Sequence, residues 1–279
     1  QITLRFPSVG ATETLLLSAA LAQGSTVLRG AAREPEICDL AAFLNRCGAS
    51  VQGAGSSTIR VEGRRSLSGC SFAPMADRIV ASTLACACAA AGGRVELAGC
   101  APETYRPLLE ILEQMGCMVS CEPGGAVISR FGALYGVGKV FTGVYPALAT
   151  DAAPLLAAAM LAADSESSIE DVVFERRFGC AEGFAAFGAR VETEGRTLRI
   201  CPCGSLCGAE AAAPDLRGGA ALVIAALAAR GKSKVTNTAL IDRGYAGLER
   251  MIAELGGQIR RETRPEEGTE KKRPAKKQI

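Results

Sequence analysis

The sequence predicts an α/β protein built from repeated βαβα-type units, with helices facing inward and sheets facing outward. Three observations predict this class: glycine marks four helix-to-strand junctions, an Ala-rich apolar helix precedes each of them, and a polar turn precedes the second helix of each unit. The junction glycines recur about every 70 residues, and they are Gly48, Gly116, Gly188 and Gly256. Four glycines with such similar spacing indicate a repeated unit rather than coincidence.

The stretch from 215 to 261 is the clearest copy of this unit. Its apolar run over Leu216–Ala229 stops at a basic residue and a glycine, which predicts a buried helix. β-Branched residues in 232–240 predict a short strand with one solvent-facing side. Apolar positions at helical spacing after Tyr245 predict a second helix, and 258–260 is expected to start another strand. The unit is therefore interpreted as helix, strand, turn, helix, strand.

The other three units follow the same order. Their first helices are expected at Leu15–Ala22, Ile79–Ala91 and Ala152–Ala163. Their second helices are expected at Leu40–Arg46, Leu108–Met115 and Glu182–Phe187. Polar turns precede the second helices at 33–36, 101–104, 174–178 and 241–245. Because the first helices are apolar on nearly every side, we expect them to pack inside, with the sheets outside.

Composition limits the class of protein before any motif is considered. The chain has 279 residues and is 48% hydrophobic, which is enough for one large or two ordinary globular domains. No apolar run reaches the ~18 residues of a membrane span and the N-terminus lacks a secretory pattern, so a cytoplasmic location is expected. The 12 cysteines are scattered and are expected to be reduced thiols. Histidine is absent and the cysteines of 201–207 lack a fourth ligand, so no metal is expected.

The chain is expected to divide into three parts. The pattern gives way to glycine, serine and basic residues at 63–74, which predicts a boundary between one unit at 1–70 and three units at 71–259. The part at 260–279 carries eight Lys or Arg, four Glu and two prolines without apolar periodicity, and is expected to be a disordered basic tail. The remainder is slightly acidic, so neither a nucleic acid nor a membrane is an expected partner. A nucleic-acid role for the tail is the weaker alternative.

A series of motifs runs along the chain in one order. They are FPSVGATE (6–13), AAREPE (31–36), ADRI (76–79), YPALATD (145–151), VFERRFG (173–179), EGRT (194–197), DLRGGAAL (215–222) and IDRGY (241–245). With this string, residues 2 to about 261 resemble the UDP-N-acetylglucosamine 1-carboxyvinyltransferases, the enolpyruvyl transferases of the first committed step of peptidoglycan synthesis. The resemblance implies the alpha-beta prism fold, in which six related units form two domains with the active site in the cleft between them.

The resemblance also implies that four of the six units are present. Roughly the first third of the family sequence is then expected to be missing. That part would hold a Lys-Asn pair that helps to bind phosphoenolpyruvate and a mobile loop with the catalytic cysteine or aspartate, a role assigned to none of the cysteines here. Gln1 is not an initiator methionine, which favours a cropped enzyme over a natural remnant.

The substrates that the resemblance implies are UDP-N-acetylglucosamine and phosphoenolpyruvate, with no cofactor. Phosphoenolpyruvate carries a carboxylate and a phosphate, and guanidinium groups bind such anions well. Arg177, Arg217 and Arg243 each lie at a turn or a helix start, where a lone arginine is usually solvated or structural. The family match assigns them to phosphoenolpyruvate and the tetrahedral intermediate, with Arg243 in a catalytic role. Asp215 is either the partner of Arg217 or the N-cap of its helix.

Asp151 precedes an Ala-rich run, so by position alone it is a helix N-terminal acid. By resemblance it hydrogen-bonds the sugar 3-hydroxyl and takes its proton as the oxygen attacks the enol carbon. The amide side chains that follow this aspartate in the family are replaced by Ala152, Ala153 and Pro154. This departure weakens the expected sugar site.

The nucleotide end of the site is expected at the first helix. Ser8, Val9 and Gly10 open a helix expected from Ala11, and N–H groups at a helix start suit a pyrophosphate. By resemblance these three residues contact uridine diphosphate, and Val173 contacts the nucleotide sugar. The turn at 33–36 is expected to cap a helix and to form a salt bridge.

Three functional hypotheses follow. The first is an enolpyruvyl transferase sequence, incomplete at its N-terminus, whose activity belongs to the full protein; the chain alone is expected to show no transfer. The second is a non-catalytic scaffold that binds UDP-sugar weakly. The third is a transferase with another acceptor, such as the shikimate-pathway enzyme, and the nucleotide-sugar motifs disfavour it. Because the unit at 1–70 would expose core surface, isolated chains are expected to aggregate or pair.

Overall fold

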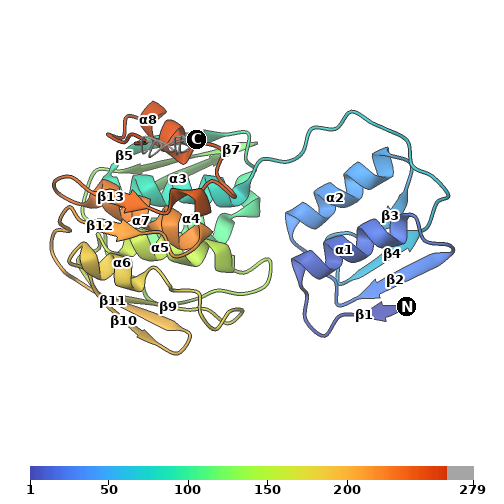
Figure 1. The fold of residues 1–279 in the computed structure, drawn as a ribbon, viewed down its shortest axis with the longest axis horizontal. Coiled ribbons are helices and arrows are strands. Elements are labelled where there is room, and N and C mark those ends of the chain that lie inside the picture. The colour runs from blue at the N-terminus through green and yellow to red at the C-terminus, as the bar shows by residue number, and fades with distance from the viewer. Residues whose placement is uncertain (263–279) are drawn as a thin grey trace, which may run out of the picture.

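A computed structural model describes residues 1–262 as two bodies joined by an extended segment (Figure 1). Each body has its own cluster of buried hydrophobic residues, one within 16–61 and the other within 79–252. These two clusters support the predicted boundary near residue 70, which stays a prediction. The predicted tail lies, from residue 263 onward, outside the described residues.

The first body is a four-stranded sheet with two helices on one face (Figure 1). Its strand order is β1-β2-β4-β3, with bounds β1 (Ile2–Thr3), β2 (Ser25–Arg29), β3 (Ser50–Gln52) and β4 (Thr58–Glu62). The helices are α1 (Val9–Ala20) and α2 (Pro35–Arg46). The expected start of α1 at Ala11 is wrong by two residues, because the helix already begins after Ser8. Leu17 of α1 and its C-cap residue Leu21 are 52% and 57% exposed, so part of the apolar surface of this helix faces solvent.

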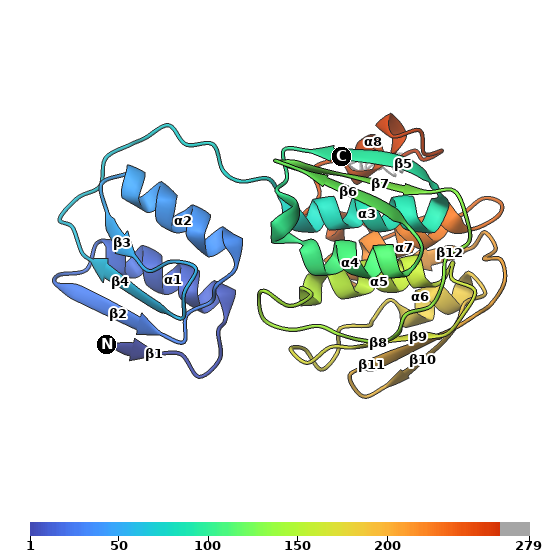
Figure 2. The same ribbon diagram turned by 180° about the vertical axis from the view of Figure 1, so that it is seen from behind.

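The second body contains three units, each with two helices and a sheet of two to four strands, around a helical centre (Figure 2). Its inner helices are α3 (Arg78–Ala91), α5 (Ala153–Met160) and α7 (Leu216–Ala228), and the second helices of the units are α4 (Arg106–Gln114), α6 (Ala181–Ala186) and α8 (Leu248–Glu254). One sheet, ordered β5-β7-β6, contains β5 (Gly93–Ala98), β6 (Met118–Glu122) and β7 (Gly125–Arg130). A second, ordered β10-β11-β9-β8, contains β8 (Gly138–Phe141), β9 (Ser167–Glu170), β10 (Arg190–Glu194) and β11 (Thr197–Cys201). The third pairs β12 (Glu210–Ala212) with β13 (Lys234–Thr236) in parallel.

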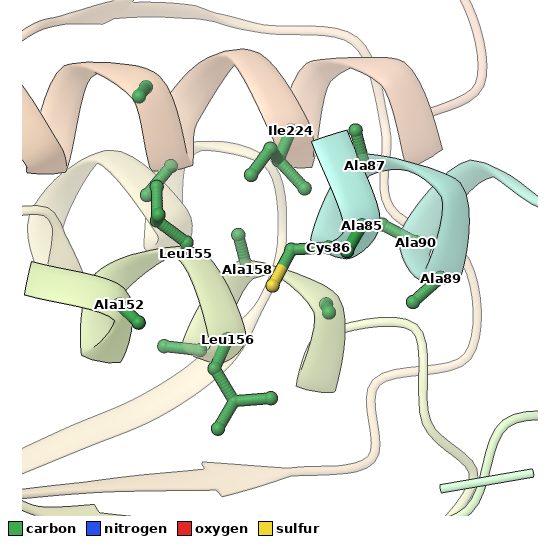
Figure 3. Packing of buried hydrophobic residues seen from close by; sticks show 14 of the residues in the cluster. Ala85, Cys86, Ala87, Ala89, Ala90, Ala152, Leu155, Leu156, Ala158 and Ile224 are labelled. Atoms are coloured by element: carbon green, nitrogen blue, oxygen red, sulfur yellow. The ribbon is translucent and has the colours of Figure 1, made fainter. Parts of the chain in front are cut away.

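The helices α3, α5 and α7 pack against one another between the sheets (Figures 2 and 3). Small side chains such as Cys86 and Ala158 let their backbones approach, while Leu155 and Ile224 fill the space between them, and all four are fully buried. Such helices have no polar face because no side of them meets water. The predicted α/β class with inward helices and outward sheets is therefore confirmed.

Each second helix ends in the same hydrogen-bonded turn. The four junction glycines have positive φ between 83° and 101°, a conformation that glycine adopts without a steric penalty. In α2, the Gly48 N–H donates to the Asn45 carbonyl and the Ala49 N–H donates to the Leu44 carbonyl, and the other three helices repeat this pair of bonds at Gly116, Gly188 and Gly256. The predicted helix ends at all four glycines are confirmed, and at Gly48, Gly116 and Gly188 a strand follows as predicted.

The unit also differs from its predicted form in two places. A second strand follows the first after the junction glycine, and β4, β7 and β11 are these additional strands. Each one lies between two other strands of its sheet, so the full unit is βαβαββ. The strand expected at 258–260 is wrong, since these residues have no regular secondary structure.

Candidate active site

A cleft of about 850 Å³ is lined by residues of both bodies. The first body contributes Ser8, Val9 and Gly10 at the start of α1, together with Glu36 and Phe43 of α2. The second body contributes Arg78, Tyr145, Thr150, Asp151, Val173, Phe174 and Arg217. Residues predicted for the nucleotide end therefore share one cleft with residues predicted for the reacting end.

One ion pair crosses from body to body in this cleft. Arg78 begins α3 and donates from Nε to Glu36 Oε1 of α2 at 2.8 Å. The guanidinium also lies over the Tyr145 ring, 5.8 Å from its centroid. The salt bridge predicted for the turn at 33–36 is confirmed, whereas its predicted cap is wrong, because the Glu34 side chain accepts from the Arg33 N–H instead of capping α2.

Asp151 is shared by two arginines. Its Oδ1 lies 3.2 Å from Arg177 Nη2, and its Oδ2 lies 3.2 Å from Arg217 Nε. Asp151 sits in a 3-10 turn, Thr150–Ala152, ahead of α5, so it is not a cap of that helix. The side chains of Arg177 and Arg217 are mostly buried, at 15% and 12% exposed, while the Asp151 side chain is 40% exposed. Two buried positive groups and one accessible carboxylate therefore meet at one point.

The buried carboxylate of Asp171, which the sequence did not predict as a site residue, contacts this cluster through Arg177 and Thr150. Asp171 is fully buried, pairs with Arg177 at 3.5 Å, and accepts a hydrogen bond from the Thr150 hydroxyl. It also accepts the backbone N–H groups of Val173 and Phe174 at 2.8 and 2.7 Å. Asp171 thus fixes the loop after β9, the turn before α5 and one guanidinium together. The only signal in the sequence is an acid placed directly after a predicted strand.

Arg217 is positioned by aromatic and acidic neighbours. Its guanidinium lies 5.4 Å from the centroid of the Tyr245 ring, and the Tyr245 hydroxyl hydrogen-bonds Thr83 of α3 at 2.8 Å. Burial disfavours the charge, but Tyr245 and Asp151 outweigh it and raise the pKa of Arg217 above its ordinary value. Its Nη1 is buried without a hydrogen-bond partner among the described residues. An unsatisfied guanidinium nitrogen beside a cleft suits an anionic ligand.

Of the remaining predicted residues, Asp215 and Ser8 cap helices, whereas Arg243 lies outside the Asp151 cluster. Asp215 caps α7, since its Oδ1 accepts the Gly218 N–H at 2.7 Å, and Asp151 rather than Asp215 pairs with Arg217. Ser8 caps α1 by accepting the Ala11 N–H at 3.3 Å. Arg243 is exposed on the turn before α8 and makes no ion pair within residues 1–262, so the structure does not bring it into the Asp151 cluster.

The cysteines show no sign of a metal site. Among the described residues, no group of three or more Cys, Asp or Glu side chains is arranged to hold a metal ion. All 12 cysteines, which lie within residues 1–262, are free thiols. Within the same residues, every helix is too short or too polar to cross a membrane.

Comparison with known proteins shows which family this chain resembles. The family model of EPSP synthase (3-phosphoshikimate 1-carboxyvinyltransferase) matches residues 1–252. Over 94% of its length the chain is 42% identical to UDP-N-acetylglucosamine 1-carboxyvinyltransferase 1 of Symbiobacterium thermophilum, and 40% identical to the corresponding enzyme of Solidesulfovibrio magneticus. These matches cover 59% and 63% of the two relatives, so the chain spans about six tenths of their length.

A solved structure shares the fold of this chain. The enolpyruvyl transferase NikO of Streptomyces tendae superposes with a TM-score of 0.79 at 28% identity, over 93% of this chain and 65% of its own. The resemblance to the carboxyvinyltransferases that the motifs predicted is therefore confirmed. On the family match over residues 1–252, the chain belongs to the EPSP synthase family of carboxyvinyltransferases.

Proposed function

We propose that this cleft binds UDP-N-acetylglucosamine and phosphoenolpyruvate, and that the chain forms part of an enzyme that transfers the enolpyruvyl group to the sugar 3-hydroxyl. The observation that carries the proposal is the Asp151 cluster, in which one accessible carboxylate meets two buried guanidinium groups. The relatives at about 40% identity, named for this reaction, support the choice of acceptor. The reaction belongs to cytoplasmic peptidoglycan synthesis, and so to cell-wall formation, cell shape and the cell cycle.

The chemistry divides between the two kinds of group in the cluster. Arg177 and Arg217 bind the carboxylate and phosphate of phosphoenolpyruvate, with the free Nη1 of Arg217 as one donor. Arg243 is proposed to join them when the substrate is bound, since its exposed side chain makes no ion pair with the residues that the structure describes. The sugar hydroxyl then loses its proton and adds to the enol carbon while the methylene carbon gains a proton and becomes a methyl group. Phosphate then leaves as this methyl group loses a proton, which restores the enol double bond.

Asp151 is the proposed general base for the addition step. Both of its oxygens face a guanidinium, so one of them must release its partner before it accepts the hydroxyl proton. An anionic substrate that binds Arg177 or Arg217 breaks the ion pair of that arginine with Asp151 and so frees one carboxylate oxygen. Ser8, Val9 and Gly10 are proposed to hold the pyrophosphate at the α1 N-terminus, and Val173 to contact the nucleotide sugar.

Ligand binding to the 279-residue chain tests the proposal. We expect UDP-N-acetylglucosamine to raise the melting temperature, and phosphoenolpyruvate to raise it further, because ligands that bind only the folded state stabilise it. Shikimate 3-phosphate is the matched alternative acceptor. A shift with shikimate 3-phosphate and none with the nucleotide sugar would overturn the proposed acceptor. Since the chain spans about six tenths of its relatives, we expect the chain alone to show no transfer.

A further inference from the structure

The segment that joins the two bodies is fastened to the first body along its length. The Ser68 N–H donates to the Cys47 carbonyl at 2.8 Å, and Leu67 packs against the core of the first body. Further on, the Phe72 ring meets Phe43 of α2 edge to face at 5.5 Å. The Met75 N–H donates to Asp39 at 3.2 Å. The linker therefore follows the surface of α2 before it enters α3.

Two thiols face each other within this contact. The Sγ atoms of Cys47 and Cys70 lie 3.3 Å apart, close enough for a direct hydrogen bond between the thiols. Cys47 is the C-cap residue directly after α2 and is 7% exposed, whereas Cys70 lies on the linker and is partly exposed. The hydrogen bond to Cys70 raises the pKa of the Cys47 thiol, and burial adds to this effect.

We propose that Cys47 and Cys70 form a reversible disulfide that fastens the linker to the first body. A disulfide needs its sulfur atoms at about 2.05 Å, so the pair must close by little more than 1 Å from the observed 3.3 Å. Cys47 is held in place by the glycine-terminated turn of α2, while Cys70 lies in irregular backbone. We therefore expect Cys70, rather than Cys47, to move when the two sulfur atoms come together.

A small-molecule disulfide such as glutathione disulfide is the oxidant. The Cys70 thiolate attacks one of its sulfur atoms, its S–S bond breaks, and one small thiolate leaves. The Cys47 thiolate then attacks the Cys70 sulfur of this mixed disulfide and expels the second small thiolate. The protein loses two protons and two electrons in total, and the oxidant becomes two thiol molecules. Exposure favours Cys70 as the first residue to react, and the 3.3 Å contact favours Cys47 as the second.

The expected consequence is a change at the cleft. Phe72, Pro74 and Met75 line the cleft and follow Cys70 by only a few residues. A bond at Cys70 restrains this part of the wall and the stretch from Gly63 onward. Oxidation is therefore expected to limit how far the two bodies separate, and reduction to restore that freedom. This inference is independent of the proposed function, because it needs no substrate.

Peptide mapping of the full chain tests the bond directly. After incubation with glutathione disulfide, unfolding with alkylation and digestion with trypsin, the two cysteines fall in separate peptides, 47–60 and 66–78, each with no other cysteine. We expect these two peptides to appear joined, about 2 Da below the summed masses of the separate thiols, and to separate with dithiothreitol. Cys70→Ser should abolish the joined species, while Cys121→Ser, at an exposed cysteine, should leave it unchanged.

A second measurement reports the restraint rather than the bond. Native-state cleavage after Arg64 or Arg65 requires the linker to open, so oxidation should slow it on the order of tenfold, and only in chains that retain Cys70. If oxidation leaves Cys47 as a free thiol, with glutathione attached to Cys70, the proposal is wrong. It is equally wrong if Cys47 pairs with Cys38 instead.

Discussion

Arg78 of α3 and Glu36 of α2 join two otherwise separate hydrophobic cores through a 2.8 Å ion pair. The Arg78 side chain is 9% exposed, so it has little water to replace a lost partner. The Glu36 side chain is 39% exposed, but its Oε2 is buried without a hydrogen-bond partner among the described residues. Loss of Glu36 therefore costs more than loss of an ordinary surface carboxylate. The pair also sits in the cleft wall, which makes it a link between the stability of the two bodies and the shape of the site.

We expect Glu36→Gln to lower the free energy of unfolding by about 1–3 kcal/mol, because it leaves a mostly buried guanidinium without its counter-ion. Urea unfolding measures this change. Glu110→Gln, on the exposed side of α4, removes the same charge and should change the free energy by less than about 0.5 kcal/mol. Equal effects of the two substitutions would show that the pair between the bodies contributes nothing.

Local sequence signals explain why much of the fold was predictable. The backbone after each second helix has a positive φ, which favours glycine, so the sequence shows a glycine at the residue where the helix ends. The apolar helices were equally readable, because burial on all sides removes polar residues from them. The additional strands β4, β7 and β11 were not predicted from the sequence. In β4, however, Ile59 and Val61 are buried and alternate with exposed Thr58 and Arg60, as a strand pattern requires.

The site was harder to predict because its contacts link distant segments. Asp151 and Arg217 are 66 positions apart, and nothing near either one identifies its partner. Asp171 was missed because a buried carboxylate and an exposed one look alike in a sequence. The cap made by Asp215 could be predicted, because its partner Gly218 lies only three residues away. The sequence favoured this cap and a pairing of Asp215 with Arg217 equally.

Asp151→Asn should tighten the binding of phosphoenolpyruvate while it abolishes any transfer by the complete enzyme. The carboxylate competes with the substrate for Arg177 and Arg217. Its removal leaves Arg177 Nη2 and Arg217 Nε without this partner, while Arg177 keeps its ion pair with Asp171. We expect a roughly 3- to 10-fold lower Kd, measured by isothermal titration with phosphoenolpyruvate. Asp164→Asn makes the same change of net charge at an exposed residue and should leave the Kd unchanged. Weaker binding by the Asp151 variant would contradict the competition.

Arg177→Met should destabilise the second body through Asp171. The substitution leaves a fully buried carboxylate with only neutral hydrogen-bond donors, at a cost of about 3 kcal/mol. Asp171→Asn in the same chain removes the unpaired charge, so the double variant should lose less stability than the two single variants summed. Chemical denaturation of all four proteins measures the coupling. Arg176→Met, at the exposed neighbouring residue, is the control, and strictly additive losses would rule out the pairing.

Cys180 should make the protein less stable as the pH rises above 9. Burial, helped by the nearby Asp215 carboxylate, raises the pKa of its thiol from 9.0 to about 12. Between these values the unfolded chain releases the proton and the folded chain keeps it, so the free energy of unfolding falls with pH, by about 1.4 kcal/mol per unit.

Cys180→Ala removes this proton and should flatten the decline by that amount between pH 9.5 and 11, whatever constant loss the smaller side chain causes. Urea unfolding at several pH values measures the slope. Other buried thiols, such as Cys117 with a pKa raised by burial to about 11, keep part of the decline in the variant. The exposed Cys121→Ala is the control and should retain the full slope. Parallel slopes for the wild type and Cys180→Ala would mean that this thiol ionises as readily in the folded chain as in the unfolded one.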